Sequence, residues 1–292
     1  MRTALAKLVL YSTALLPLPV AHFIGAMAGH LLYLIPNRHR HISAININLC
    51  LPQLTATQRK QLLHQSLVEL GKTIFETGAL WRWQRNKALR LVKKVSGEAL
   101  LEQALASGKG AILAAPHLGA WEIVGIYNST RYPMTSLYRP PKLQALDHLV
   151  RNARERMGAT LVPTDASGVR ALFRAVQHNE LIAILPDQDP GDAGSVFAPF
   201  FGQPARSMTL VARLAQKTGA SVIFCYAERL AAGQGFHIHY LPAPASIADA
   251  DSQKAVNALN QGVEECVRRC PTQYQWSYKR FKARPQGQAS PY

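Results

Sequence analysis

The fold is decided by the stretch Gly110-Ala-Ile-Leu-Ala-Ala-Pro-His-Leu-Gly-Ala-Trp-Glu122. An uninterrupted apolar run ends at Pro116, His117 follows at once, and Glu122 comes five residues after the histidine. A short apolar run of this kind predicts a strand that is buried on both faces of a parallel sheet. The residues that follow, Leu118 to Tyr127, predict a helix.

His117 and Glu122 can meet only at a corner of the chain. On one continuous helix, residues five apart point about 140° away from each other. The pair therefore requires His117 in the turn between strand and helix and Glu122 in the first helical turns. Open α/β sheets bind their ligands at such corners, and a histidine beside a carboxylate predicts a general base. The alternative is a capping or surface histidine, with a glutamate that only favours the helix dipole.

From about residue 109 onward, short apolar runs alternate with helical stretches. This alternation predicts an α/β fold with a mostly parallel central sheet flanked by helices. We expect strands at 110–115, 134–138, 160–162, 181–185, 221–226 and 236–241. We expect helices near 119–128, 142–157, 166–178, 207–217 and 252–269, with Ser207 starting one of them and Gly219 ending it.

Polar side chains follow two more of these strands. Arg139 comes directly after 134–138, and Asp187, Gln188 and Asp189 come after 181–185. Polar groups that converge at strand ends are typical of a binding or catalytic site. The stretch 196–202 is expected to be an apolar loop that either belongs to the core or lines a slot for an apolar substrate.

The N-terminal region, residues 3–35, is almost entirely apolar. Pro17 and Pro19 divide it into two helical pieces, each shorter than the roughly 20 residues that cross a bilayer unaided. The basic residues of 38–41 follow directly. This pattern predicts membrane-associated helices that lie in, or dip through, a membrane with the basic flank in the cytoplasm. The alternative is a pair of core helices in a soluble protein. Residues 42–107 are expected to be helical.

Composition points to an anionic partner and to reduced cysteines. The 292 residues carry a formal net charge of +16, which favours binding to nucleic acid, an acidic protein or an anionic membrane surface. The four cysteines lack the spacing of a zinc site and are expected to be buried thiols. His237 and His239 are expected on a surface strand, because no third metal ligand has an obvious spacing. We therefore expect no metal.

Several enzyme classes are excluded by their missing motifs. A serine hydrolase would carry G-x-S-x-G, which the sequence lacks. A nucleotide-binding enzyme would carry a Walker lysine or a glycine-rich turn after a strand, whereas Gly108-Lys-Gly110 precedes one. A membrane-attached nucleic-acid-binding protein would explain the charge, but it would leave the polar strand ends unexplained.

The motifs of this chain resemble those of the bacterial lipid A biosynthesis acyltransferases, the late lauroyl and myristoyl transferases of the lysophospholipid acyltransferase superfamily. The resemblance covers nearly the whole chain and is carried by 115–122, 138–140, 185–190, 197–202 and the closing segment 273–285. It implies a glycerol-3-phosphate acyltransferase-like α/β fold. It also implies four regions: membrane helices at 1–36, a helical region at 37–108, the catalytic region at 109–285 and a flexible tail at 286–292.

The resemblance further implies a reaction. A fatty acyl chain of roughly 10–14 carbons (C10–C14) would pass from acyl carrier protein to a hydroxyl of the 3-hydroxyacyl chains of a lipid A precursor. His117 would be the base and Glu122 would orient it. Arg139, or backbone amides at the start of the 118–127 helix, would stabilise the oxyanion, and Asp187, Gln188 and Asp189 would contact substrate.

The same resemblance implies the cellular setting. No cofactor or metal would be needed, with acyl carrier protein as co-substrate carrier, and the partners would include the anionic inner membrane surface but no nucleic acid. The enzyme would lie at the cell inner membrane with its catalytic region on the cytoplasmic face. A lysophospholipid, an aminolipid or another glycolipid stays open as the acceptor.

Overall fold

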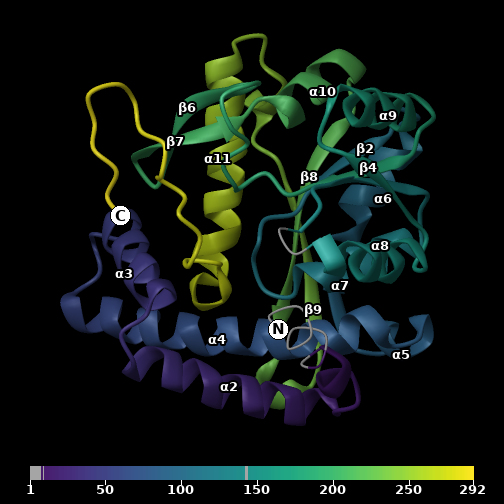
Figure 1. The fold of residues 1–292 in the computed structure, drawn as a ribbon. Helices are drawn as coiled ribbons and strands as arrows, with labels where there is room; N and C mark the ends of the chain where they lie inside the picture. Colours follow the sequence, from purple (N-terminus) through teal and green to yellow (C-terminus); the bar gives the residue numbers. More distant parts are fainter. Residues whose placement is uncertain (1–7, 9, 142–143) are drawn as a thin grey trace.

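The computed structural model describes residue 8, residues 10–141 and residues 144–292. Its centre is a β-sheet (Figure 1). The seven strands of this sheet have the order β1-β9-β8-β2-β5-β3-β4. The five strands from β8 to β4 run parallel, β9 runs antiparallel to β8, and β1 is parallel to β9. The strands are β1 (Val92–Ser96), β2 (Ala111–Ala114), β3 (Met134–Tyr138), β4 (Ala159–Pro163), β5 (Leu181–Ile184), β8 (Ser221–Arg229) and β9 (Phe236–Pro242).

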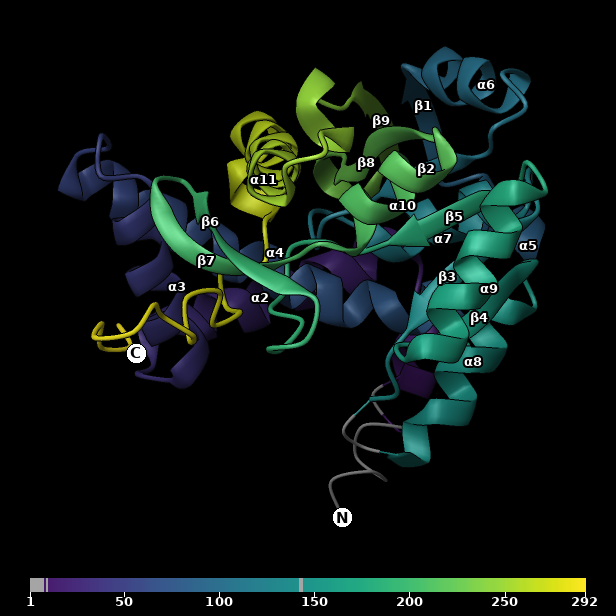
Figure 2. The same ribbon diagram turned by 90° about the horizontal axis from the view of Figure 1, so that it is seen from above.

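Helices cover both faces of this sheet, so the prediction of a mostly parallel sheet flanked by helices is confirmed (Figure 2). Three helices pack buried side chains into a hydrophobic cluster on one face of the sheet, and three others do so on the opposite face; helices described below add residues to both clusters. The first set is α9 (Ala166–Gln177), α10 (Leu210–Thr218) and α11 (Ser252–Arg269). The second set is α6 (Glu98–Ala106), α7 (Trp121–Ser129) and α8 (Asp147–Glu155).

Three predictions of secondary structure were wrong in detail. β1 lies within the stretch that we expected to be helical, because its five residues join the edge of the sheet beside β9. The expected apolar loop at 196–202 is strand β6 (Ser195–Phe200), which pairs with β7 (Gln203–Met208). The helix expected from Ser207 begins at Leu210, because Ser207 is a buried residue of β7 that hydrogen-bonds Asn260. Gly219, in the left-handed conformation, ends this helix as predicted.

A long helix, α4 (Ala56–Arg82), runs across one end of the sheet, and α2 (Leu18–Leu34) lies along it (Figure 1). Thr55 and Gln58 form a capping box that starts α4. The two helices touch backbone to backbone: a Cβ atom added at Gly29 would lie 2.3 Å from the Cα of Val68. Further helices are α3 (Arg38–Cys50), α5 (Arg85–Leu89) and the 3₁₀ turns 144–146, 231–233, 245–248 and 271–273, and residues 10–14 are also helical.

The face of α2 that points away from α4 is exposed and apolar. Phe23, Met27 and Leu31 form a stripe on it, with side chains between 56% and 66% exposed. Of the described residues, no single helix combines the length and apolar content that crossing a bilayer requires. α2 and α3 reach them only together, and the chain bends by 79° between the two.

The last segment of the chain returns to α3. The side-chain amide of Asn46 donates to the carbonyl oxygens of Trp276 and Tyr278 at 2.6 and 2.7 Å. Tyr292 donates its hydroxyl hydrogen to Asn46 and accepts a hydrogen bond from the backbone of Phe281. The stretch that we expected to be a flexible tail, 286–292, therefore ends in hydrogen bonds to α3 and to residue 281.

Candidate active site

His117 lies in a short loop, residues 116–120, between the carboxyl end of β2 and α7. Distant segments fix this loop through its backbone. The His117 carbonyl accepts from the Gln275 N–H at 3.1 Å, the Gly119 N–H donates to the Gln273 carbonyl at 3.0 Å, and the Ala120 N–H donates to the Ala227 carbonyl at 2.8 Å. The loop is thus held by β8 and by the closing segment of the chain.

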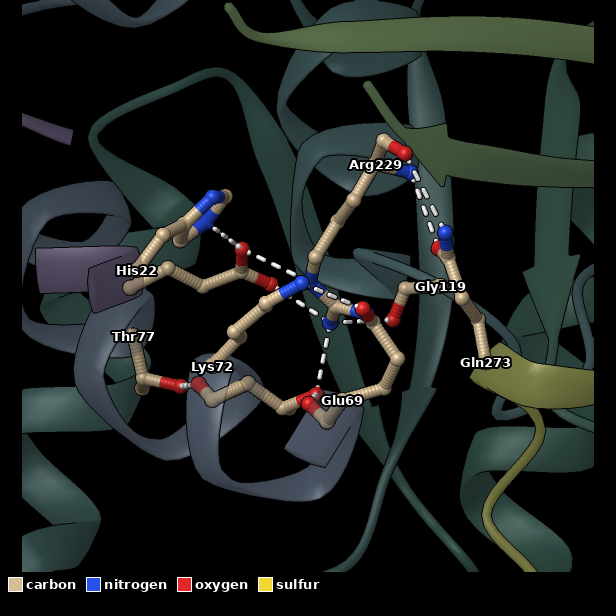
Figure 3. A network of polar contacts seen from close by, with 9 residues as sticks. His22, Glu69, Lys72, Thr77, Gly119, Arg229 and Gln273 are labelled. Atoms are coloured by element: carbon tan, nitrogen blue, oxygen red, sulfur yellow. Dashed lines mark hydrogen bonds and ion pairs between the residues drawn. The ribbon is translucent and has the colours of Figure 1, made fainter. Parts of the chain in front are cut away.

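Only glycine fits at position 119. Its φ is +61°, and a Cβ atom there would lie 1.9 Å from the carbonyl oxygen of Ala227. The Gly119 carbonyl accepts from the Arg229 guanidinium at 2.8 Å (Figure 3). The same guanidinium makes two hydrogen bonds to Glu76 of α4, at 2.7 and 2.9 Å, and Glu76 bonds His22 of α2 at 2.8 Å. A buried ionic network therefore connects α2 and α4 to the loop of His117.

The carboxylate that orients His117 is Asp187. Oδ1 lies 2.8 Å from His117 Nδ1, and Oδ2 accepts the backbone N–H of His117 at 3.0 Å. Burial raises the pKa of Asp187, but the His117 imidazole and the hydrogen bonds from it outweigh this and hold the pKa below its ordinary value of 3.8. An ionised Asp187 keeps the proton of a neutral imidazole on Nδ1, so Nε2 has a free lone pair.

Nε2 faces the side chain of Gln188. The Gln188 amide nitrogen lies 3.2 Å from His117 Nε2 and 3.1 Å from Gln275 Oε1. The amide group is therefore assigned to donate to both, which fits an unprotonated Nε2. Gln275 belongs to the closing segment, so one end of the chain supplies both a backbone and a side-chain contact to the site.

Glu122, which we expected to orient His117, is hydrogen-bonded to a different side chain. Both of its carboxylate oxygens accept from Arg154 of α8, at 2.6 and 3.1 Å, and neither is hydrogen-bonded to His117. Burial raises the pKa of Glu122, but the Arg154 guanidinium outweighs this and lowers it below the ordinary value. Glu122 lies in the first turn of α7, as the sequence predicted, but Nδ1 of His117 is already hydrogen-bonded to Asp187.

One of the two expected oxyanion donors is already occupied. The backbone N–H groups of Leu118, Gly119 and Ala120 donate to carbonyl groups of the protein, so these amides are not free for a substrate. The other, Arg139, is exposed and lines the cavity described below. Asp189, which we expected to contact substrate, also lines that cavity, where it is buried and accepts from Arg206 at 2.8 and 3.1 Å.

A cavity of about 990 Å³ opens beside His117. Its lining includes the apolar side chains Trp121, Leu137, Phe173, Leu185, Met208 and Leu214. It also includes six cationic side chains, Arg139, Arg154, Arg170, Arg174, Arg213 and Lys217. The arrangement suits an amphipathic substrate that carries an apolar chain and negative charge. Sequence reasoning did not find Arg206 or Arg229, which reach the site from distant elements.

The amino-acid sequence is similar to one family across almost its whole length. The profile of the family described as bacterial lipid A biosynthesis acyltransferase matches residues 2–283. The lipid A biosynthesis lauroyltransferase and palmitoleoyltransferase of Escherichia coli (strain K12) are each 28% identical over 285 residues, covering 97% of this chain and 92% of the relative. The lipid A biosynthesis myristoyltransferase of the same strain is 22% identical over 281 residues, covering 94% and 83%.

Proposed function

The chain belongs to the bacterial lipid A biosynthesis acyltransferase family, and we propose that it acylates a lipid A precursor with a fatty acyl chain from acyl carrier protein. The acceptor is a hydroxyl of a 3-hydroxyacyl chain, and the transferred chain has roughly 10–14 carbons. The observation that carries the proposal is the position of His117 at a cavity that is lined by both apolar and cationic side chains. About 990 Å³ lies at the top of the usual range of about 300–1,000 Å³ for small-molecule sites, and an acyl chain with part of its acceptor needs such space.

In the proposed reaction, His117 is the general base. Nε2 takes the proton of the acceptor hydroxyl as its oxygen attacks the thioester carbonyl carbon. Asp187 holds the imidazole in the required tautomer and stabilises the imidazolium, as the aspartate of a catalytic triad does. The tetrahedral intermediate then expels the thiolate, which recovers the proton from Nε2, so that the products are an ester and a thiol. No acyl-enzyme is formed.

The negative charge of the intermediate requires a donor. Gln188 presents its amide N–H beside Nε2, and Arg139 lines the same cavity. The loop amides of residues 118–120 are occupied, whereas the Gln188 N–H that Nε2 accepts is released when Nε2 takes the proton. We therefore assign the oxyanion to Gln188 and Arg139. Glu122 acts one step away, by fixing Arg154 in the cavity wall.

The cationic side chains of the cavity and the apolar face of α2 support the proposed substrates and the proposed location. Lipid A precursors carry phosphate groups and acyl carrier protein is acidic, and arginines are well suited to bind either. The outward stripe on α2 supports binding to the cytoplasmic face of the inner membrane, with the helix lying in the interface. Family membership and this cavity favour an acyltransferase over the nucleic-acid-binding protein that the charge alone left open.

The test is a transfer assay read by mass spectrometry. Purified full-length protein receives acyl carrier protein loaded with C10, C12 or C14 chains, with a tetra-acylated lipid A precursor or a lysophospholipid as acceptor. We expect the mass of one acyl chain to be added to the lipid A precursor by the wild type and by His178→Ala, a change of an exposed histidine after α9. We expect none with His117→Ala. Transfer to the lysophospholipid alone would overturn the acceptor, and full activity of His117→Ala would overturn the mechanism.

A further inference from the structure

Three side chains with metal-binding atoms meet on the antiparallel pair β8–β9, outside the cavity of His117. His237 and His239 are two residues apart on β9, so they share one face of the strand. Glu228 of β8 is the direct cross-strand partner of His237, so it lies on that same face. The sequence suggested no third ligand for the two histidines because this ligand comes from the neighbouring strand.

The three groups are close enough to share one ion. One ligand atom from each of them lies within 4.8 Å of the others, and among the residues that the structure describes this is the one such group of three. His239 Nε2 is 3.1 Å from Glu228 Oε2, and the ring centroids of the two histidines are 3.7 Å apart. Ligands bound at about 2.0–2.2 Å to one tetrahedral ion stand little more than 3 Å apart, so only small rotations are needed.

Neighbouring side chains orient both imidazoles. Ser96 Oγ lies 2.8 Å from His237 Nε2, and this contact leaves Nδ1 as the nitrogen open to a metal. Tyr226 stacks on His239, with ring centroids 4.7 Å apart and planes 9° apart. Outer partners that fix the second ring nitrogen and the ring plane are usual around metal-bound histidines.

The exposure of the three side chains also fits. Glu228, His237 and His239 are all partly exposed, so an ion can enter from solvent and keep a water ligand.

We propose that Glu228, His237 and His239 bind one zinc ion, with water as the fourth ligand. Two imidazoles and one carboxylate form a set that zinc takes in tetrahedral geometry. The ion joins β8 to β9 at the residue before Arg229, the arginine that holds Gly119. Its role is therefore to stabilise this strand pair, separate from the chemistry at His117.

The test is calorimetric titration of the full-length, chelator-treated protein with zinc chloride. We expect one equivalent to bind to the wild type. His237→Ala, His239→Ala and Glu228→Gln should each weaken binding by more than the about 10–100-fold that loss of an outer-shell partner costs. Zinc should raise the melting temperature of the wild type but not that of these variants.

The control has to exclude the other place where two imidazoles meet. His30 Nδ1 and His64 Nε2 are 2.7 Å apart on α2 and α4. His64→Ala should therefore keep the wild-type affinity, and so should His178→Ala. Undiminished zinc affinity in His239→Ala, a loss confined to His64→Ala, or no stoichiometric binding by the wild type would overturn the proposal. Glu228→Gln preserves shape, so it answers the question even if an alanine variant fails to fold.

Discussion

Asp187 binds His117 through both of its carboxylate oxygens, one on the imidazole Nδ1 at 2.8 Å and the other on the backbone N–H at 3.0 Å. The register of the sheet produces this relationship. β2 and β5 are parallel neighbours that end with Ala114 opposite Ile184. His117 follows three residues after Ala114, and Asp187 follows three residues after Ile184. The two side chains therefore leave the sheet side by side.

Asp187→Asn should remove the base while leaving the fold. The amide has no charge, and it can present an N–H to Nδ1, which favours the tautomer with the proton on Nε2. We expect kcat to fall by about 10²–10⁴-fold with little change in KM. Steady-state kinetics with a circular dichroism spectrum of the same sample measures this. The opposite result, a kcat loss of this size in Glu122→Gln and none in Asp187→Asn, would show that Glu122 rather than Asp187 supports His117.

The Glu122–Arg154 pair should act as an energetic unit. The Glu122 side chain is 10% exposed and that of Arg154 29%, so each charge depends on the other. Removing one partner leaves the other charge poorly solvated, and the two changes together are less harmful than their sum. Urea unfolding of Glu122→Gln, Arg154→Gln and the double variant should give a coupling energy of about 0.5–3 kcal/mol. Strictly additive losses of stability would show that the pair is not coupled.

Gly119→Ala should be far more harmful than Gly125→Ala. At position 119 the new methyl group meets the Ala227 carbonyl in a left-handed backbone, whereas at position 125 of α7 nothing lies within 4 Å. We expect Gly119→Ala to lower both the melting temperature and the transfer rate. Gly125→Ala should retain both, with a gain of about 0.5–1 kcal/mol in the free energy of unfolding. Equal behaviour of the two variants in thermal unfolding would contradict the close approach of this loop to β8.

The outward stripe of α2 should control membrane binding. Replacing Phe23, Met27 and Leu31 together by serine removes apolar area that we assign to the lipid interface. We expect the triple variant to lose co-sedimentation with anionic vesicles, with its helix content and melting temperature unchanged. A variant that still sediments at low salt but not at high salt would assign the binding to the basic residues instead.

The Glu76–Arg229 pair should make stability depend on acid pH. Burial raises the pKa of Glu76, but Arg229 and His22 outweigh it, so the folded-state pKa lies below the ordinary 4.5. A lowered pKa contributes stability above pH 4.5 that is lost as the pH falls from there through the folded-state value. Between pH 7 and pH 3, the free energy of unfolding measured with urea should fall more for the wild type than for Glu76→Gln. Parallel plots of this free energy against pH for the two proteins would exclude the contribution.

The strands of the parallel sheet and the polar groups at their ends could be predicted from the sequence. It placed His117, Arg139 and Asp187 at strand ends because buried apolar runs followed by a polar residue are local patterns. It paired His117 with Glu122, which is near in sequence, whereas the carboxylate that hydrogen-bonds His117 in the structure is Asp187, which is near only through the pairing of β2 with β5. Strand order is a property of the whole chain, and no short pattern encodes it.

Other misses have a similar cause. β6 and β7 carry prolines at positions 199 and 204, which face each other in the hairpin, so the segment had the composition of a loop. Arg154 is 32 residues from its partner Glu122 in the sequence. Arg229 is 110 residues from its partner Gly119. Pairing at such separations depends on tertiary packing rather than on spacing.

The hydrogen bonds from residues 273 and 275 to the loop of His117 have a consequence for the biogenesis of the protein. During synthesis, β2 and His117 leave the ribosome long before these partners exist, so the nascent chain carries His117 in an incompletely held loop. The loop reaches its final geometry only after the closing segment has been made and has docked. The geometry around His117 thus depends on translation of almost the whole chain, and an interrupted product that ends before residue 273 lacks these hydrogen bonds.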